Sequence, residues 1–149
     1  MVVENYIIVA LLAMAPISES RGAIIVGLGM GLNSVFVLIL SILANMVLIP
    51  VAFFLLRQAK VKDFFFKLFK HHADKHIEKN EHKFSLLKEL ALFGFVAVPL
   101  PFTGVASAAL ISEILGWDQT KSSIAISAGI VVASIVVWAG TLGIIRLFF

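Results

Sequence analysis

The chain has no cysteine and few charged residues. Its 149 residues include 12 Lys and Arg and 9 Asp and Glu, so charged residues make up 14%, against roughly 25% in soluble domains. Without cysteine, disulfides and thiol chemistry are excluded. The hydrophobic fraction of 60% and the mean hydropathy of +1.05 predict an all-α integral membrane protein. The length predicts one membrane domain, residues 1–149.

The basic residues are concentrated in one stretch. Nine of the twelve lysines and arginines lie between Arg57 and Lys88. In a membrane protein such a bias is a topology signal rather than a nucleic-acid footprint, because cytoplasmic loops collect lysine and arginine. We therefore expect a multi-pass protein of the cell membrane with residues 57–88 in the cytoplasm, and we expect no nucleic acid among its partners.

The same stretch carries a helical apolar stripe. Val61, Phe64, Phe65 and Leu68 follow a helical spacing, and lysines flank them. A helix of this kind lies in the membrane interface with its apolar face inward. Residues 58–85 are therefore predicted to be a basic amphipathic linker.

No metal, cofactor or enzymatic activity is predicted. All four histidines lie in the basic stretch, and the four-residue spacing of His72 and His76 could place two ligands on one helix face. No cysteine accompanies them and charged residues surround them, so a solvated face is favoured. The histidines also stand apart from any serine motif, so no nucleophile and base come together.

A polar break interrupts the first apolar run. It contains Pro16, Ser18, Glu19, Arg21 and Gly22, and an apolar arm of about ten residues lies on either side. Each arm is ~15 Å long as a helix, so the break falls near the middle of a ~30 Å hydrocarbon core. A charge is costly there, and irregular backbone is tolerated only against protein or a wet cavity. We interpret the break as the tip of a helical hairpin.

A second break follows the linker. Pro99 and Pro101 remove backbone donors and stop a helix, and Thr103 and Gly104 follow directly. Glu113, ten residues further on, is a secondary candidate for the site. We favour a surface acid at headgroup depth for Glu113, because it is close to the next turn.

Two longer apolar stretches are predicted to be spanning helices. They cover residues 34–56 and 119–148. Asn45 lies at the centre of the first and needs a hydrogen-bond partner there. Two roles stay open for Asn45: it could hydrogen-bond to another helix, or it could line the same site as Glu19.

Helix-breaking and turn residues recur in the two halves of the chain at a shift of 85 positions. The matching pairs are Pro16 and Pro101, Ser18 and Thr103, Gly31 and Gly116, and Asn33 and Asp118. The match predicts two inverted repeats, residues 5–57 and 86–149, each a re-entrant helical hairpin followed by a transmembrane helix. Four full spans with kinked first segments are the alternative. Hairpins are favoured because two prolines and a charge pair disrupt a helix more than a kink requires.

These breaks also carry a family resemblance. Residues 16–24 (Pro-Ile-Ser-Glu-Ser-Arg-Gly-Ala-Ile) resemble the opening motif of the small multidrug export family, and residues 44–45 and 98–104 are similar to its later motifs. That family is distantly related to the DedA, or VTT-domain, membrane proteins. The resemblance covers most of the chain except the linker. It implies two inverted re-entrant hairpins and a transport or lipid-translocation activity that depends on a proton gradient.

We therefore expect a proton-coupled membrane transporter or lipid flippase. A small amphiphile or an anionic lipid headgroup would pass through a mid-membrane site at the hairpin tips. The candidate residues for substrate and proton binding are Glu19, Arg21, Ser18, Asn45 and Thr103. Glu19 would carry the proton, and a substrate that engages Arg21 would make Glu19 easier to protonate.

Three alternatives stay open at this stage. The chain could exchange protons for cationic amphiphiles at Glu19, as a small multidrug exporter. It could be a non-transporting membrane scaffold. Glu19 and Arg21 could also form a buried ion pair that only holds the hairpin tip. If the chain is a transporter, a homodimer is expected, because one chain of 149 residues has few segments with which to enclose a substrate pathway.

Overall fold

The computed structural model describes residues 2–58, 81–100 and 103–148, and the regular structure in these ranges is helical. The helices are α1 (Val2–Met14), α2 (Glu19–Gly29), α3 (Ser34–Leu56), α5 (Glu81–Ala97), α6 (Val105–Ile114) and α7 (Gln119–Phe148). The all-α prediction is thus confirmed for these ranges. The predicted stripe with Phe64 and Phe65, the histidines His72 and His76, and Pro101 lie outside the described residues.

Helices α3 and α7 are the long elements of the fold. They contain 23 and 30 residues, or about 35 and 45 Å of helix, and their apolar windows have mean hydropathies of 2.7 and 2.2. Each is long enough to cross a ~30 Å hydrocarbon core. Large apolar side chains on their outer faces are exposed, including Leu43, Phe54 and Ile124.

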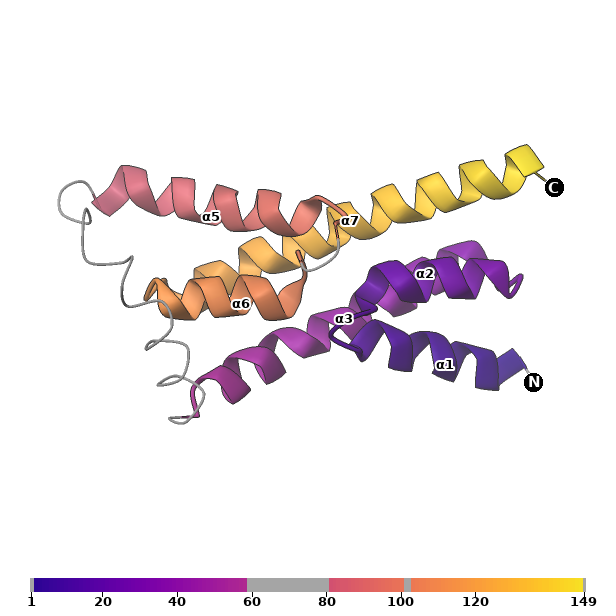
Figure 1. Ribbon diagram of the computed structural model, residues 1–149, viewed down its shortest axis with the longest axis horizontal. Helices are drawn as coiled ribbons and strands as arrows, with labels where there is room; N and C mark the ends of the chain where they lie inside the picture. Colours follow the sequence, from indigo (N-terminus) through magenta and orange to yellow (C-terminus); the bar gives the residue numbers. More distant parts are fainter. Residues whose placement is uncertain (1, 59–80, 101–102, 149) are drawn as a thin grey trace.

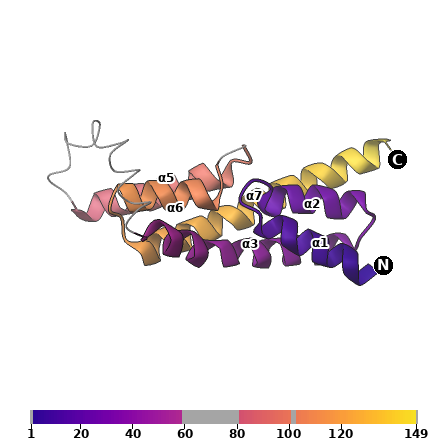
Figure 2. The ribbon, with the colours of Figure 1, turned by 60° about the horizontal axis from the view of Figure 1, so that its bottom comes forward.

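The shorter helices form two antiparallel pairs. Helix α1 packs along α2, and α5 contacts α6. The connections inside the two pairs lie near the middle of the molecule, while both chain termini lie at one end (Figure 1). A second view shows the same order along the long axis (Figure 2). Helices α1, α2 and α6 have 13, 11 and 10 residues, at most about 20 Å. None of these three is long enough to span a bilayer alone.

The turns before the two long helices are alike. Gly31 and Gly116 both have positive φ, 71° and 64°, a conformation that glycine adopts without steric cost. Asn33 and Asp118 then each accept a hydrogen bond from the backbone N–H three residues on, at 3.0 and 2.9 Å. Both act as helix N-caps. Each turn is therefore followed directly by the start of a long helix.

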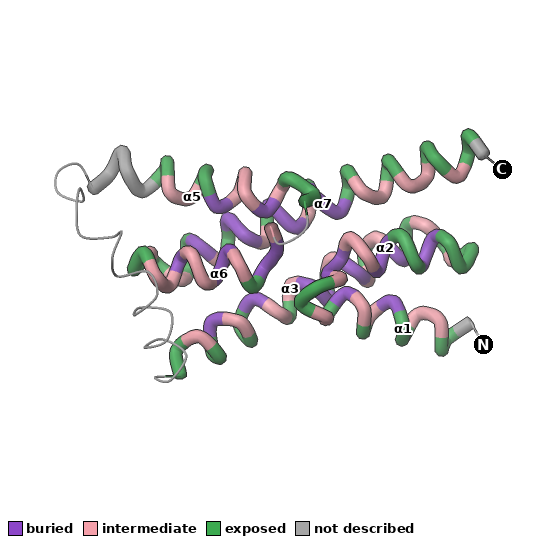
Figure 3. The backbone as a smooth tube through the Cα atoms, viewed as in Figure 1, coloured by how far each residue is buried: buried purple, intermediate pink, exposed green. Residues whose placement is uncertain are grey.

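The buried residues form two clusters rather than one; Figure 3 marks the buried residues along each helix. One cluster includes Val9, Ala23, Ile24, Val37 and Ala44; the other includes Phe53, Val96, Val105, Ile126 and Ile130. Helix α3 contributes its first half to one cluster and its second half to the other. The long helices therefore join two packed ends, and the polar breaks meet between them.

Helices α5 and α7 approach each other closely at a ridge of small residues. Ala125, Gly129 and Ala133 recur every four residues on α7, which predicts a packing ridge. All three are buried. A Cβ atom added to Gly129 would lie 2.7 Å from Val96 Cβ and 3.0 Å from the carbonyl oxygen of Phe93 on α5. The ridge prediction is confirmed, and the contact has no space for a methyl group.

Gly129→Ala is therefore expected to destabilise the protein. The added methyl group must push α5 away, at a cost of about 1–3 kcal/mol. Gly140→Ala on the same helix is the matched control, since a Cβ there has no neighbour within 4 Å. It should leave stability unchanged or raise it by up to ~1 kcal/mol through helix propensity. Thermal unfolding in detergent compares the two variants, and equal melting temperatures would contradict the close contact.

Candidate functional site

Arg21 connects the two polar breaks. From α2, its guanidinium donates to the carbonyl oxygens of Leu100 (2.6 Å), Val96 (2.8 Å) and Thr103 (3.1 Å), and to Thr103 Oγ1 (3.0 Å). These acceptors lie in the last turn of α5 and in the break between α5 and α6, at least 75 positions further along the chain. A planar guanidinium with five donors can serve such a spread of acceptors, which one ammonium group cannot.

Arg21 donates to carbonyls at and just beyond the end of a helix. Helix α5 ends at Ala97, so the carbonyls of its last turn have no partner within the helix. Pro99 supplies no N–H to replace them. Thr103 Oγ1 also lies 2.7 Å from the Val98 carbonyl oxygen and 2.9 Å from that of Leu100. The arginine and the threonine together satisfy a backbone that the prolines have broken.

Glu19 makes the second connection between the breaks. Its Oε1 accepts a hydrogen bond from the backbone N–H of Val105 at 2.8 Å, at the start of α6. Gly104, the N-cap residue, has no side chain to supply this bond. The carboxylate takes the place of the cap, where negative charge also interacts favourably with the helix dipole.

Close packing around Glu19 explains two features of the backbone. A Cβ atom on Gly104 would collide with the Glu19 carboxylate, so a larger residue there would displace Glu19 from the Val105 N–H. Glu19 itself has φ of 51°, and among the described residues it is the one non-glycine with positive φ. Such a conformation costs on the order of 1 kcal/mol and is held in place by surrounding contacts. The side chain is 6% exposed.

Glu19 and Arg21 do not pair with each other. Among the described residues, the ion pair found is between Lys121 and Glu89, and none joins Glu19 to Arg21. Glu19 and Arg21 interact through their charges but form no direct ion pair within 4 Å. Each charged side chain instead binds backbone groups of the opposite hairpin, because the broken helix ends offer unsatisfied carbonyls and N–H groups.

A buried polar cluster lies next to this joint. Asn45 Nδ2 donates to Ser20 Oγ at 3.1 Å, and Ser134 Oγ donates to the same oxygen at 2.8 Å. All three residues are at most 1% exposed. Asn45 Oδ1 and Ser41 Oγ are buried and have no hydrogen-bond partner in the part of the chain that the structure describes. The cluster holds α2, α3 and α7 together where they cross.

The sequence interpretation missed three members of this cluster. Ser20, Ser41 and Ser134 were not among the candidates. Ser41 lies four residues before Asn45, on the same helix face, and this spacing was an available signal. Nothing local marks Ser134, which is 114 positions from its partner Ser20.

A cavity of about 350 Å³ opens between the two breaks. Its lining includes Pro16, Ser18, Glu19 and Arg21 from the first break and Leu100 and Gly104 from the second. Gly22 and Pro99 also line it. Most of the predicted break residues therefore meet at one place, and two charged side chains face the space between them.

The remaining predicted residues lie at or beyond the edge of this cavity. Thr103 is not part of the cavity lining, but it accepts a hydrogen bond from Arg21, which lines the cavity. Asn45 belongs to the buried cluster and is not part of the cavity lining. Glu113 lies near the opposite end of α6 from the joint. Within residues 2–58, 81–100 and 103–148, no three histidine, cysteine or acidic residues come together to hold a metal ion.

The fold and the joint define a class of protein. Two apolar helices can cross a bilayer, large apolar side chains cover their outer faces, and Glu19 and Arg21 bind backbone groups at a joint between broken helices. These are the features of a polytopic membrane protein.

The family follows from comparison with known sequences. Residues 19–136 match the family model described as "Putative small multi-drug export protein". The match covers most of the chain, so the chain belongs to this family, and the resemblance seen in the breaks is confirmed. The family is described as one of exporters, which implies a transporter rather than an enzyme. No curated protein and no solved structure matches the chain.

Proposed function

We propose that the chain is a proton-coupled membrane transporter whose moving part is the joint between the two breaks. The observation that carries this proposal is the contact of Glu19 and Arg21 with the broken backbone of the opposite hairpin, beside a cavity of about 350 Å³. Ionisable residues inside a membrane are costly, and they mark substrate and proton pathways. The family description as an exporter agrees with this reading.

We further propose that the chain is built from two inverted repeats with re-entrant hairpins. The matched turns at Gly31 and Gly116 and the matched caps at Asn33 and Asp118 support it. The short helices also support it, because they end at mid-molecule (Figure 1). In this topology the hairpins enter from opposite membrane faces, and each long helix crosses once.

This topology makes a prediction about orientation. Residues 57–88 should be cytoplasmic by the positive-inside rule, and both termini should be on the other side. An epitope tag at either terminus should then react with an antibody on intact cells, whereas a tag in the linker should react only after permeabilisation. Termini on the same side as the linker would favour four full spans and contradict the hairpins.

Protonation of Glu19 is the proposed coupling event. The charged carboxylate accepts the Val105 N–H and stabilises the start of α6. A protonated carboxyl group is a weaker acceptor and carries no charge for the helix dipole. Proton binding would therefore loosen α6 from α2 and change the access to the cavity.

The cavity favours a cationic amphiphile as the exchanged substrate. Arg21 already donates to four protein oxygens, so a cationic group can approach Glu19 without releasing them. The apolar side chains of Ile17 and Leu100 also line the cavity and are 95% and 55% exposed, available for a hydrophobic body. An anionic lipid headgroup is the second candidate; it would need Arg21 to leave its backbone partners.

Transport by the purified protein tests the proposal. Vesicles with an acidic interior should take up a fluorescent lipophilic cation faster when they contain the protein, and a protonophore should abolish the difference. A fluorescent phospholipid whose headgroup is reduced from outside tests the second candidate in the same vesicles. If the folded and correctly inserted protein showed neither activity, the membrane-scaffold alternative would replace the transporter proposal.

A further inference from the structure

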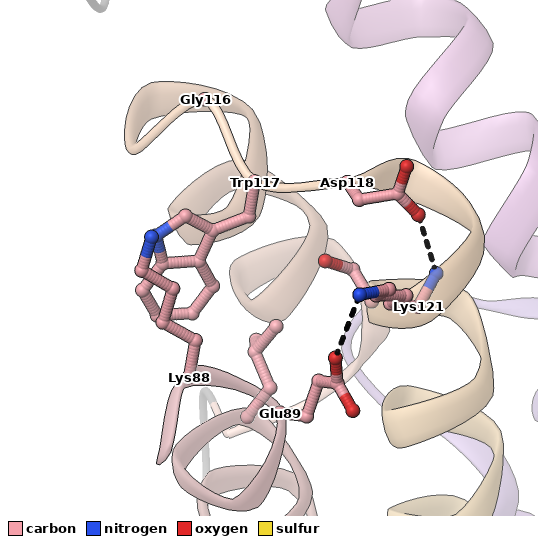
Figure 4. Close-up of a pocket in the computed structure, with 8 residues that line it drawn as sticks. Lys88, Glu89, Gly116, Trp117, Asp118 and Lys121 are labelled. Atoms are coloured by element: carbon pink, nitrogen blue, oxygen red, sulfur yellow. Dashed lines mark hydrogen bonds and ion pairs between the residues drawn. The ribbon is translucent and has the colours of Figure 1, made fainter. Parts of the chain in front are cut away.

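A second cavity lies far from the joint, at the end of the molecule where α3 leaves and α5 begins. It has a volume of about 180 Å³ and is lined by side chains of α5, the α6–α7 turn and the start of α7 (Figure 4). Its charged lining consists of Lys88, Glu89, Asp118 and Lys121. Trp117 forms one wall, with the Lys88 ammonium 5.9 Å from the centre of its ring.

The charges in this cavity alternate and balance. Lys121 Nζ lies 3.8 Å from Glu89 Oε1, a long contact between side chains that are 58% and 34% exposed. Ion pairs of this kind are weak and exchange readily with other charged groups. Asp118 caps α7 through one oxygen, which accepts from the Lys121 backbone N–H at 2.9 Å. The cavity thus presents two cations and two carboxylates within one small volume.

An apolar groove continues directly from this cavity. It has a volume of about 220 Å³, lies between α5 and α7, and shares Glu89 and Lys121 with the polar cavity. Leu86, Leu90 and Ile124 line it and are 64%, 58% and 65% exposed. The small side chains of Ala125 and Ala128 leave space between these larger apolar side chains.

Along α7 the groove extends from Lys121 to Ala128, beyond the charged cavity and toward the middle of the molecule, whereas on α5 the groove and the cavity lie side by side. On α5 it follows Leu86, Leu90 and Phe93, a rise of about 10 Å. It lies just before the point where Gly129 packs against Val96 and the two helices touch. A polar cavity beside an interfacial tryptophan, followed by an apolar groove along a spanning helix, has the order of a phospholipid: headgroup first, then acyl chain.

We propose that these two cavities form a binding site for a phospholipid with a zwitterionic, amine-bearing headgroup. The lipid phosphate lies between Lys88 and Lys121, and its ammonium group faces Glu89 and Asp118. One acyl chain occupies the groove over Ala128. The balance of the four charges favours a zwitterion over an anionic lipid, because an anionic headgroup would leave the two carboxylates facing negative charge.

Trp117 can report this binding directly. In a Trp138→Phe variant it is the single tryptophan of the chain. The full-length variant is placed in phosphatidylcholine vesicles with brominated phosphatidylethanolamine or brominated phosphatidylglycerol, since bromine quenches tryptophan on contact. Phosphatidylethanolamine should quench at about a fivefold lower mole fraction than phosphatidylglycerol. Quenching that follows the bulk mole fraction of either lipid, or a preference for phosphatidylglycerol, would overturn the proposal.

Two pairs of variants separate the headgroup from the chain. Glu89→Gln combined with Asp118→Asn should remove the preference or turn it toward phosphatidylglycerol, because only the two lysines then carry charge in the cavity, whereas Glu113→Gln, on α6, should keep it. Ala128→Phe fills the groove and should also remove the preference. Ala139→Phe makes the same change at another exposed position of α7 and should not.

The readout in each case is the ratio between the two lipids, which is independent of the intrinsic brightness of each variant. A retained preference in Ala128→Phe would refute the groove. If a second copy of the chain covered this surface instead, Trp117 would be shielded from both lipids. Ala128→Phe would then convert a dimer to a monomer in a mass measurement in nanodiscs, which would refute the lipid site.

Discussion

Glu19→Gln is expected to abolish proton-driven transport while the protein remains folded. Glutamine has the same shape, and its amide oxygen can still accept the Val105 N–H bond that Glu19 Oε1 accepts at 2.8 Å. Only the charge and the ability to exchange a proton are lost. The change from a charged to a neutral acceptor should lower stability by about 1 kcal/mol, whereas a transporter that cannot bind its proton has no coupling.

The measurement combines gradient-driven uptake in vesicles with thermal unfolding of the same preparation. Glu113→Gln is the matched control, an acid on α6 away from the joint, and it should transport normally. Glu19→Asp keeps a titratable carboxyl group on a shorter side chain and should retain part of the activity. Full transport by Glu19→Gln with a lowered melting temperature would instead make Glu19 a structural cap.

Arg21→Lys is expected to produce the largest loss of stability in the joint. The guanidinium satisfies three carbonyl oxygens and one hydroxyl, spread from Val96 to Thr103. A lysine ammonium group is a single point that cannot reach both ends of this set. The carbonyl of Val96 or of Thr103 would lose its donor, whereas the Leu100 carbonyl keeps the Thr103 N–H at 3.4 Å, so the expected cost is about 1–3 kcal/mol.

Thermal unfolding in detergent and proteolysis between α5 and α6 both report this loss. The melting temperature should fall by several degrees, and the break at residues 98–104 should become more sensitive to protease. Arg146→Lys, near the end of α7, is the matched control and should change neither. If Arg21→Lys melted like the wild type, the hydrogen bonds from Arg21 to the second break would not contribute to stability.

Several elements of the fold followed from local patterns in the sequence. The apolar stretch at residues 34–56 is helix α3 as predicted, because a long run of apolar residues specifies its own helix in a membrane setting. The turn at residues 31–33 also followed from its glycine and asparagine. Helix α5 already includes Glu81, where the described residues resume, within the stretch assigned to the linker.

The site was predictable only in part. Prolines and charges in an apolar run marked both breaks, since each is costly in a spanning helix. Their meeting at one cavity was consistent with the hairpin interpretation. The partners of Glu19 and Arg21 were not predictable, because adjacent opposite charges suggested an ion pair and no local signal pointed to the backbone of the other hairpin.

The sequence by itself determined that the chain is helical and apolar, where its long helices run, and where they are broken. These properties depend on hydropathy, on proline and on turn residues, which act over a few positions. Only the tertiary structure decided that Glu19 caps α6, that Arg21 holds the carbonyls before it, and that Ser20, Asn45 and Ser134 share one hydrogen-bonded cluster. The physical reason is distance along the chain: these partners are 25 to 114 positions apart, and helix packing alone brings their atoms within 3 Å or so of one another.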